Sequence, residues 1–335
     1  MTFPGSDLCT IRKLGLDLVL HAPIRSKVLP GTEFSDDSGT SPMNTQAETP
    51  VPPAPPETRI GIVIRVAFFV ATVLIGMLFL GPLLFTIFGT ATAAAVGLCL
   101  TGLLANLLTM RIFDRRPFAD IGLRAGRASG WNLMLGLLFG GGAATVMLLA
   151  PLLAGTGHLV ARPSSSFTWP TLVFYLVALF IAATGEEMIF RGYAFQLLVQ
   201  KIGPFATVLP VAVIFGLAHS GNPSASTLGV ANTILWGILL GYAFLRSHDL
   251  WLPIGLHFGW NAVLPLFGVN LSGLTIEVTR YFYRWDLTPL WSGGNYGPEG
   301  GLLTTIFAIA LFFALMRAPV RPQIAAIARV LNEPF

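Results

Sequence analysis

Long apolar runs separated by short polar stretches dominate the chain after residue 58. A helix needs about 20 apolar residues to cross the hydrocarbon layer of a membrane. Only helices satisfy their own backbone hydrogen bonds in lipid over such lengths. The pattern therefore predicts an all-α fold, a polytopic membrane bundle of about eight transmembrane helices. We place these spans at residues 64–87, 90–110, 131–154, 170–195, 205–220, 227–245, 250–268 and 302–317.

The composition agrees with a membrane protein. Of the 335 residues, 54% are hydrophobic and 11% are charged, whereas soluble domains average about 45–50% and about 25%. The net charge of +4 comes with arginines in the connections, so we expect membrane lipid and no nucleic acid as a partner. Cys9 and Cys99 lie far apart, which makes a disulfide framework or a thiolate metal site improbable.

The polar ends of the chain define its predicted organisation. Residues 1–58 are polar and rich in proline, so we expect a disordered N-terminal tail without a secretory signal. Residues 59–130 hold the first two spans and a basic loop, and residues 131–317 hold the other six spans as the core of the bundle. Residues 318–335 form a short C-terminal tail.

Basic residues predict the orientation in the membrane. On one side lie Arg111, Arg115, Arg116, Arg124, Arg127, Lys201, Arg246, Arg317, Arg321 and Arg329. The opposite loops hold only Arg162, Arg280 and Arg284. Because basic loops stay in the cytoplasm, both termini are expected there, and the loop at 269–300 is expected outside. The aromatic residues of that loop suit an interfacial belt.

Two adjacent carboxylates stand in the fourth apolar run. Glu187 and Arg191 are four residues apart, so they share a helix face and can pair. Glu186 points about 100° away from Glu187 and is free to face a cavity. Two adjacent carboxylates, one of them kept ionised by the arginine, suit general-base chemistry. The alternative is a structural ion cluster that ties helices together. Ionisable groups at bilayer depth are nevertheless functional candidates, since they are costly to bury.

Two further polar pairs occur in other apolar runs. Phe215 and His219 are four residues apart, and Gly216 beside them permits a close helix approach. His257 and Asn261 have the same spacing, so both can face one cavity and donate hydrogen bonds to an oxyanion. Taken singly, each is more simply a packed histidine or an interhelical hydrogen bond.

Together the three sets predict one intramembrane polar cavity, because each set must find partners in the same hydrocarbon slab. One conflict accompanies this prediction. Counting about 1.5 Å per residue along the spans places His219 about 10 Å further out than Glu186 and His257.

These motifs resemble the CPBP family of intramembrane proteases, also called the type II CAAX-prenyl endopeptidase or Abi family. The motif Glu-Glu-x-x-Phe-Arg-Gly occurs at 186–192, Phe-x-x-x-His at 215–219 and His-x-x-x-Asn at 257–261. The resemblance covers roughly residues 120–300. It implies an eight-helix fold, and a bacterial member would lie in the inner membrane.

The resemblance also implies roles for the residues. Glu186 would be the general base, oriented by Glu187 and Arg191. His219 and His257 would hold the water and the transition state, and Asn261 would donate to the oxyanion. Glu186, His219 and His257 are also candidate zinc ligands, and a metal-free glutamate mechanism is the competing form.

The predicted function is therefore an intramembrane endopeptidase that cleaves a membrane-associated peptide or protein, with prenylated CAAX-type substrates as one class. One alternative is a non-catalytic membrane protein that confers immunity or scaffolds a partner. A proton-coupled transporter is the third hypothesis, because buried carboxylates can relay protons. It is disfavoured, since the sequence shows no paired broken helices or pseudo-symmetric halves.

Overall fold

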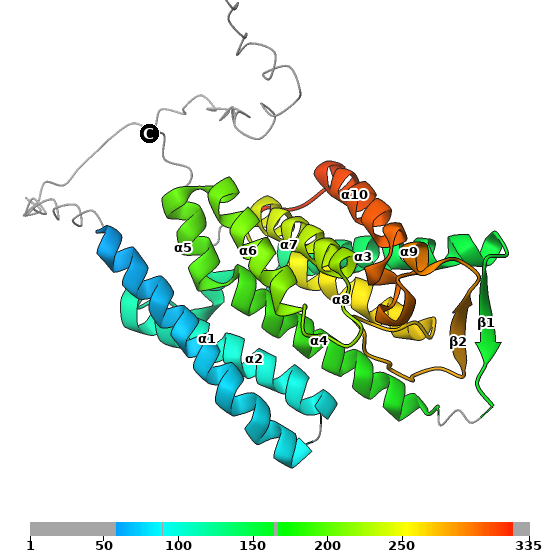
Figure 1. Cartoon of the computed structure of the whole chain (residues 1–335). Helices are drawn as coiled ribbons and strands as arrows, with labels where there is room; N and C mark the ends of the chain where they lie inside the picture. The colour runs from blue at the N-terminus through cyan, green and yellow to red at the C-terminus, as the bar shows by residue number, and fades with distance from the viewer. Residues whose placement is uncertain (1–57, 89, 164–166, 324–335) are drawn as a thin grey trace, which may run out of the picture. The chain divides into compact units, whose positions relative to one another are not determined.

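The structure is a computed structural model that describes residues 58–88, 90–163 and 167–323 (Figure 1). Apart from Thr58, the predicted N-terminal tail lies outside the described residues. The same holds for residues 324–335 of the predicted C-terminal tail.

Helices occupy all eight predicted apolar runs (Figure 1). They are α1 Arg59–Phe88, α2 Thr90–Thr109, α3 Arg127–Leu153, α4 Trp169–Arg191, α6 Pro204–Ala218, α7 Thr227–Ser247, α8 Trp251–Leu266 and α10 Leu302–Arg317. By length and composition, five stretches can cross a membrane: Arg59–Ile87, Thr92–Asp114, Arg127–Leu153, Trp169–Ile202 and Thr227–Ser247. Since α6, α8 and α10 have only 15 or 16 residues, eight complete crossings stay a prediction.

Short elements connect these helices. A π-helical turn at Met110–Asp114 and a 3-10 turn at Phe118–Ile121 lie between α2 and α3. Helix α5, Tyr193–Ile202, continues from α4 after a break at Gly192. Between α8 and α10 lie α9, Pro289–Ser292, and 3-10 turns at Gly294–Tyr296 and Pro298–Gly300.

A small two-stranded β-sheet is added to the predicted mostly helical fold. Strand β1, Gly157–Ala161, pairs antiparallel with β2, Tyr281–Trp285, so that Gly157 faces Trp285 and Ala161 faces Tyr281. Short aromatic and β-branched runs favour strands, but pairing across more than a hundred residues is not visible in the sequence. Tyr283, assigned to an interfacial belt, is instead buried and donates its hydroxyl to the Leu148 carbonyl at 2.8 Å.

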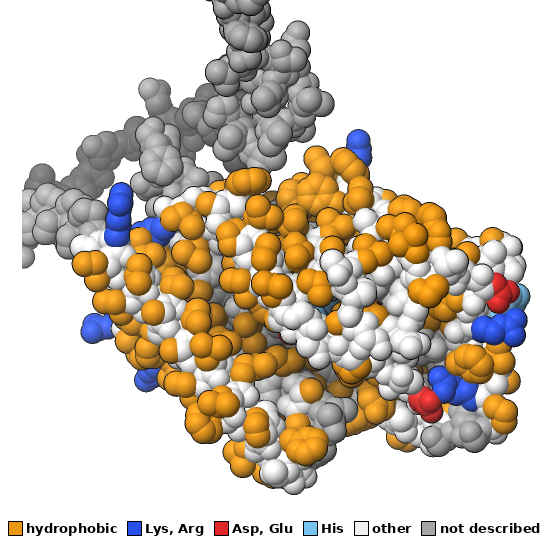
Figure 2. Space-filling model, viewed as in Figure 1, with side chains coloured by type: hydrophobic (Ala, Val, Ile, Leu, Met, Phe, Trp, Pro, Cys, Tyr) orange, Lys and Arg blue, Asp and Glu red, His pale blue; other side chains and the backbone are white. Residues whose placement is uncertain are grey.

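The surface agrees with a lipid environment. Hydrophobic side chains cover most of the face seen in Figure 2. Helix α1 is the most exposed example, with large apolar side chains such as Ile60, Leu78 and Phe79 more than 60% exposed. Acidic side chains on this face lie near β1 and β2, whereas Lys and Arg side chains lie there and also toward the α1 and α10 ends (Figure 2). The ion pairs His158–Asp286 and Arg162–Glu277 lie on or beside the two strands.

Helices α3 and α8 make the closest helix contact near the site. Gly136 and Gly140 of α3 face Gly255 and Gly259 of α8, and a Cβ atom at any of them would overlap backbone of the other helix. Such small residues, four apart, let two membrane helices approach closely. The two glycines of α8 flank His257, so this contact fixes where that histidine lies.

Helix α4 packs in the same way against α2. A Cβ atom at Gly185 would meet the Cys99 backbone. The break at Gly192 is bridged by Asn106 of α2, which donates to the Met188 carbonyl at 2.8 Å and accepts from the Tyr193 amide at 2.7 Å. The buried backbone groups left by the break are thereby satisfied.

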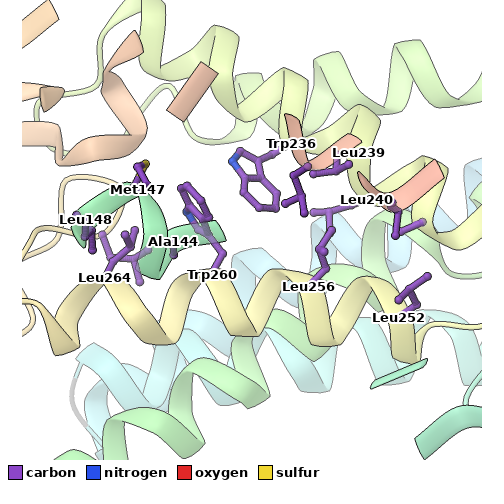
Figure 3. Packing of buried hydrophobic residues seen from close by; sticks show 14 of the residues in the cluster. Ala144, Met147, Leu148, Trp236, Leu239, Leu240, Leu252, Leu256, Trp260 and Leu264 are labelled. Atoms are coloured by element: carbon purple, nitrogen blue, oxygen red, sulfur yellow. The ribbon is translucent and has the colours of Figure 1, made fainter. Parts of the chain in front are cut away.

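A buried apolar core joins α3, α7, α8 and α10. Its members include Met147 and Leu148 of α3, Trp236 and Leu240 of α7, and Trp260 of α8. Figure 3 shows the two indoles between α7 and α8, with Met147 beyond Trp260. The ring centroids of Trp236 and Trp260 are 4.7 Å apart, so the contact between the two indoles sets the separation of α7 and α8 here.

Residues 318–323, predicted as tail, pack onto the helices. Asn132 of α3 exchanges hydrogen bonds with the Arg321 backbone, donating at 2.8 Å and accepting at 3.0 Å. The Gln323 amide donates to the Ser247 carbonyl at 2.7 Å, and its side chain donates to Asp249 at 2.9 Å. The segment therefore belongs to the folded unit.

Candidate active site

Glu187 and Arg191 form a fully buried ion pair on α4. Their side chains are 0% exposed, and Arg191 Nη1 lies 3.3 Å from Glu187 Oε1. Arg191 Nη2 also donates to the Gly237 carbonyl of α7 at 3.0 Å. The guanidinium carbon lies 4.8 Å from the Phe215 ring centroid, a cation–π distance. The pair thus ties α4 to α6 and α7, as the structural alternative for these residues proposes.

His257 binds the same carboxylate. Its Nδ1 lies 2.8 Å from Glu187 Oε1. An ionised carboxylate only accepts hydrogen bonds, so we assign the hydrogen to Nδ1. This tautomer leaves the Nε2 lone pair of His257 facing away from Glu187, and Nε2 lies 3.9 Å from Glu186 Oε2.

His219 is oriented in a similar way from α6. Its Nδ1 lies 2.8 Å from the Phe215 carbonyl oxygen, which can only accept a hydrogen bond. Nε2 therefore carries the lone pair, and it lies 3.8 Å from Glu186 Oε2. The Phe215 ring packs at 4.8 Å from the His219 ring and 6.2 Å from the His257 ring. The Phe215 ring thus packs beside both imidazoles.

Glu186 is the point on which the two imidazoles converge. Its Oε2 atom is buried and has no hydrogen-bond partner among the described residues, although the side chain as a whole is 18% exposed. An unpaired buried polar atom is costly. Glu187 also has one unpaired oxygen, Oε2, but its Oε1 binds Arg191 and His257. Glu186 differs in that its unpaired oxygen lies within 4 Å of Nε2 of both imidazoles.

The depth that the sequence predicts for His219 is wrong. Nearly the same number of residues separates Gly203 from Glu186 on one side and from His219 on the other. Both arms are helical, because α5 extends the fourth run to Ile202 before α6 begins at Pro204. A helical hairpin that turns at Gly203 therefore brings Glu186 and His219 to the same level. The error came from treating residues 196–204 as a loop.

Asn261 lies on α8 one turn after His257 and is partly exposed. Its side chain makes no hydrogen bond to another described residue. Its place one turn after His257 follows from the four-residue spacing within α8. Gly216 also lies where the sequence places a close approach, since a Cβ atom there would overlap Ile234 of α7.

The fit of a metal was tested against these distances. Two imidazoles and a carboxylate suit zinc, whose tetrahedral ligands lie about 3.3 Å apart for bonds of about 2.0 Å. The separations from Glu186 are 3.8 and 3.9 Å. No group of three or more His, Cys, Asp or Glu in the described part of the chain is arranged to hold a metal ion. Zinc binding stays a prediction, and no step below passes through a metal.

Glu299 is an acidic residue that the sequence reading did not single out. It lies after α9, and its carboxylate accepts from Trp260 Nε1 of α8 at 3.2 Å and from the Ser272 amide at 2.6 Å. Burial raises the pKa of Glu299, and the Ser272 hydrogen bonds, the charge of His219 and the Trp260 hydrogen bond oppose that rise. One acid within a run of glycines was the available signal.

Comparison with known proteins bears on this geometry. Residues 167–263 match the model of a family described as type II CAAX prenyl endopeptidase Rce1-like. This segment is therefore similar to the Rce1-like family. The match extends from the start of α4 into α8, so it includes all six predicted site residues and confirms the resemblance to the CPBP proteases. No curated protein matches the chain significantly.

The Rce1-like match supports the function at the level of a family. It indicates a CAAX-type protease, and the apolar helices indicate an integral membrane protein. It does not favour the non-catalytic alternative. Glu299, α1 to α3 and α10 lie outside the matched residues.

Proposed function

We propose that this chain is an intramembrane endopeptidase in which Glu186 activates a water molecule for peptide-bond hydrolysis. One observation carries the proposal. The buried, unpartnered Oε2 atom of Glu186 lies 3.8 Å from His219 Nε2 and 3.9 Å from His257 Nε2. Both imidazoles are held by their Nδ1 atoms, so both Nε2 atoms are left to act on a third group.

The separations suit a water between the three side chains. They exceed the length of a direct hydrogen bond, and a polar gap of this size is commonly bridged by water. A water has two hydrogens to donate, whereas three acceptors surround the gap. One of the three must therefore hold a proton. A protonated Nε2 would donate to the water or to the substrate, while Glu186 accepts from the water.

The reaction then balances in two steps. Glu186 takes a proton from the water while the water oxygen bonds to the carbonyl carbon of the substrate. The carbonyl oxygen then becomes an oxyanion. The protonated imidazole and the Asn261 amide donate to this oxyanion. The C–N bond then breaks, and Glu186 returns the proton to the leaving nitrogen. The products are a carboxylic acid and an amine.

Glu187 and Arg191 act through His257 in this proposal. The ion pair fixes the carboxylate that orients the imidazole, and Arg191 neutralises the charge that Glu187 brings into a low-dielectric site. The division of roles between adjacent glutamates follows from their partners. Glu187 is paired and Glu186 is free for chemistry.

The family match guides the choice of substrate. We propose a peptide or protein that meets the membrane through a prenyl group on a CAAX-type C terminus, with lipid around the apolar helices. We further propose a bacterial inner-membrane location with both termini in the cytoplasm, on the distribution of arginines and lysines.

The experiment that tests the proposal compares purified wild type with Glu186→Ala on a quenched fluorescent farnesylated peptide. We expect turnover to fall at least about 100-fold in the variant, the usual contribution of a general base. Glu277→Ala is the control, because Glu277 pairs with Arg162 on the outer surface, and it should keep wild-type turnover. Equal turnover by wild type and Glu186→Ala would contradict the proposal.

A further inference from the structure

The carboxylate of Glu299 joins two separate parts of the site. Its Oε1 accepts from Trp260 Nε1 at 3.2 Å, and its Oε2 accepts from the amide and the hydroxyl of Ser272 at 2.6 and 2.8 Å. Charged hydrogen bonds of this kind are about twice as strong as neutral ones. The side chain is therefore held at both oxygens, with one oxygen for each partner.

The backbone of Glu299 is also fixed. Asn232 of α7 donates its side-chain amide to the Glu299 and Gly301 carbonyls at 2.8 and 2.9 Å. Thr305 of α10 holds the Asn232 amide oxygen at 2.7 Å. The backbone of Glu299 is thus anchored to α7 and α10. Its carboxylate can therefore fix the positions of its partners, Trp260 and Ser272.

One arm of the Glu299 carboxylate leads to His219. Ser272 has φ of +48°, a left-handed conformation that costs free energy for a residue with a side chain. Both of its hydrogen bonds to Glu299 offset this cost. The next residue, Gly273, packs against the turn that follows His219, and a Cβ atom there would overlap the Pro223 carbonyl.

The turn after His219 is short and hydrogen-bonded. The Asn222 amide donates to the His219 carbonyl at 3.1 Å, and His219 itself ends α6. The position of the imidazole therefore depends on the turn that Ser272 and Gly273 support.

The other arm leads to His257. Trp260 lies on α8 three residues after His257, beside Asn261, and its indole stacks on Trp236 of α7 (Figure 3). The hydrogen bond to Glu299 fixes the free edge of that indole. Rotation or shift of α8 near the site would break it.

We infer that Glu299 is a positioning residue of the active site, which ties the turn after His219 to the helix that carries His257 and so holds both imidazoles in reach of Glu186. The inference rests on the proposed function and extends it to a residue outside the Rce1-like segment. Glu299 touches neither the scissile bond nor the water in this arrangement.

The test combines kinetics with a direct view of the histidines. The variant Glu299→Gln keeps the size of the side chain, but its amide nitrogen would meet a donor, either Trp260 or Ser272. Trp260→Phe removes one arm, and Ser272→Ala weakens the other by removing the hydroxyl bond while the backbone amide bond stays. Both are milder changes, should Glu299→Gln fold poorly. Glu277→Gln, in the same inter-helix segment but on the surface, is the control.

We expect kcat on the farnesylated peptide to fall about 10-fold or more in Glu299→Gln, with KM within about 2-fold, because the reacting groups and not the substrate contacts are displaced. The chain has five histidines, so the NMR spectrum of protein with isotope-labelled imidazole rings, recorded in detergent, contains few histidine signals. We expect the His219 signal to move in Glu299→Gln and the His158 signal to stay. The control should change neither measurement.

The outcomes separate the two proposals. An unmoved His219 signal in all three variants overturns the inference. A moved signal with wild-type kcat also overturns it and leaves the proposed function standing, provided that Glu186→Ala is inactive. If wild type is no more active than Glu186→Ala, the proposed function fails, and the His219 signal alone decides whether Glu299 positions that imidazole.

Discussion

His257 donates its Nδ1 hydrogen to Glu187 over 2.8 Å, and this bond joins α8 to α4 at the level of the proposed reaction. Glu187 is at the same time bound to Arg191. One carboxylate thus satisfies two buried groups from two helices. The bond explains why two glutamates are adjacent, since one is needed to hold the site and the other to act in it.

Removing Glu187 should therefore destabilise the protein as well as inactivate it. In Glu187→Ala, Arg191 and His257 Nδ1 lose their charged partner in a fully buried position. Breaking a buried pair in this way costs about 3–5 kcal/mol, so thermal unfolding in detergent should occur many degrees lower. Glu186→Ala should unfold near the wild-type temperature, because its Oε2 has no partner to lose. Equal unfolding temperatures for Glu187→Ala and wild type would refute the structural role.

Activity should not depend on a bound metal. Glu186 Oε2 lies 3.8 Å from His219 Nε2 and 3.9 Å from His257 Nε2, farther than the roughly 3.3 Å between two ligands of one zinc ion. Turnover after dialysis against a chelator should stay within about 2-fold of the untreated enzyme, and elemental analysis should find less than one zinc per chain. The metal form of the mechanism would be established if the enzyme held one zinc per chain, lost that zinc in His219→Ala and needed it for turnover.

The contact between α3 and α8 should be intolerant of added volume. A Cβ atom at Gly140 would overlap the Leu256 carbonyl, so Gly140→Ala must push α8 away and displace His257. Overpacking of this kind costs about 1–3 kcal/mol, and turnover should fall along with stability. Gly142→Ala on the same helix is the matched control, since Gly142 is exposed and nothing lies within 4 Å of its added Cβ atom. Similar effects of both substitutions would rule out the packing explanation.

Asp249 makes a prediction about pH. Burial raises the pKa of Asp249 above its ordinary value, and hydrogen bonds from Asn132, Leu252, Ser247 and Gln323 oppose the rise. A carboxyl with a raised pKa keeps its proton more readily in the folded state, so its contribution to stability is full below the ordinary pKa and is lost as pH rises through the raised value.

The measurement is the unfolding temperature of wild type minus that of Asp249→Asn. Because the variant cannot ionise, this difference should be largest near pH 4 and should shrink as pH rises. A difference that grows with pH would show that the hydrogen bonds, and not burial, dominate the pKa of Asp249.

The helices and the candidate site residues follow from local features of the sequence. Apolar runs place all eight helices, and spacings of four residues place Glu187 beside Arg191 and His257 beside Asn261 on their helices. The convergence of Glu186 and His219 was predictable too, had Gly203 been taken as the turn of a hairpin with equal arms. The four-residue glycine spacing in α3 and α8 was a further signal that went unused.

The remaining features depend on contacts between distant residues. Strands β1 and β2 are five residues each, too short for a periodic pattern, and each is defined by its partner. Glu299 lies in irregular turns among glycines and prolines, where no helix or strand period shows which way a side chain points. Its role follows only from Ser272 and Trp260, which approach it from other parts of the fold.

The packed segment at 318–323 has a practical consequence for expression and labelling. Asn132, Ser247 and Asp249 are buried beneath the backbone of this segment and form hydrogen bonds with it. A reporter or affinity tag fused directly after Arg317 would remove these hydrogen bonds and expose the start of α8 to water. Fusions placed beyond Gln323 leave these contacts intact.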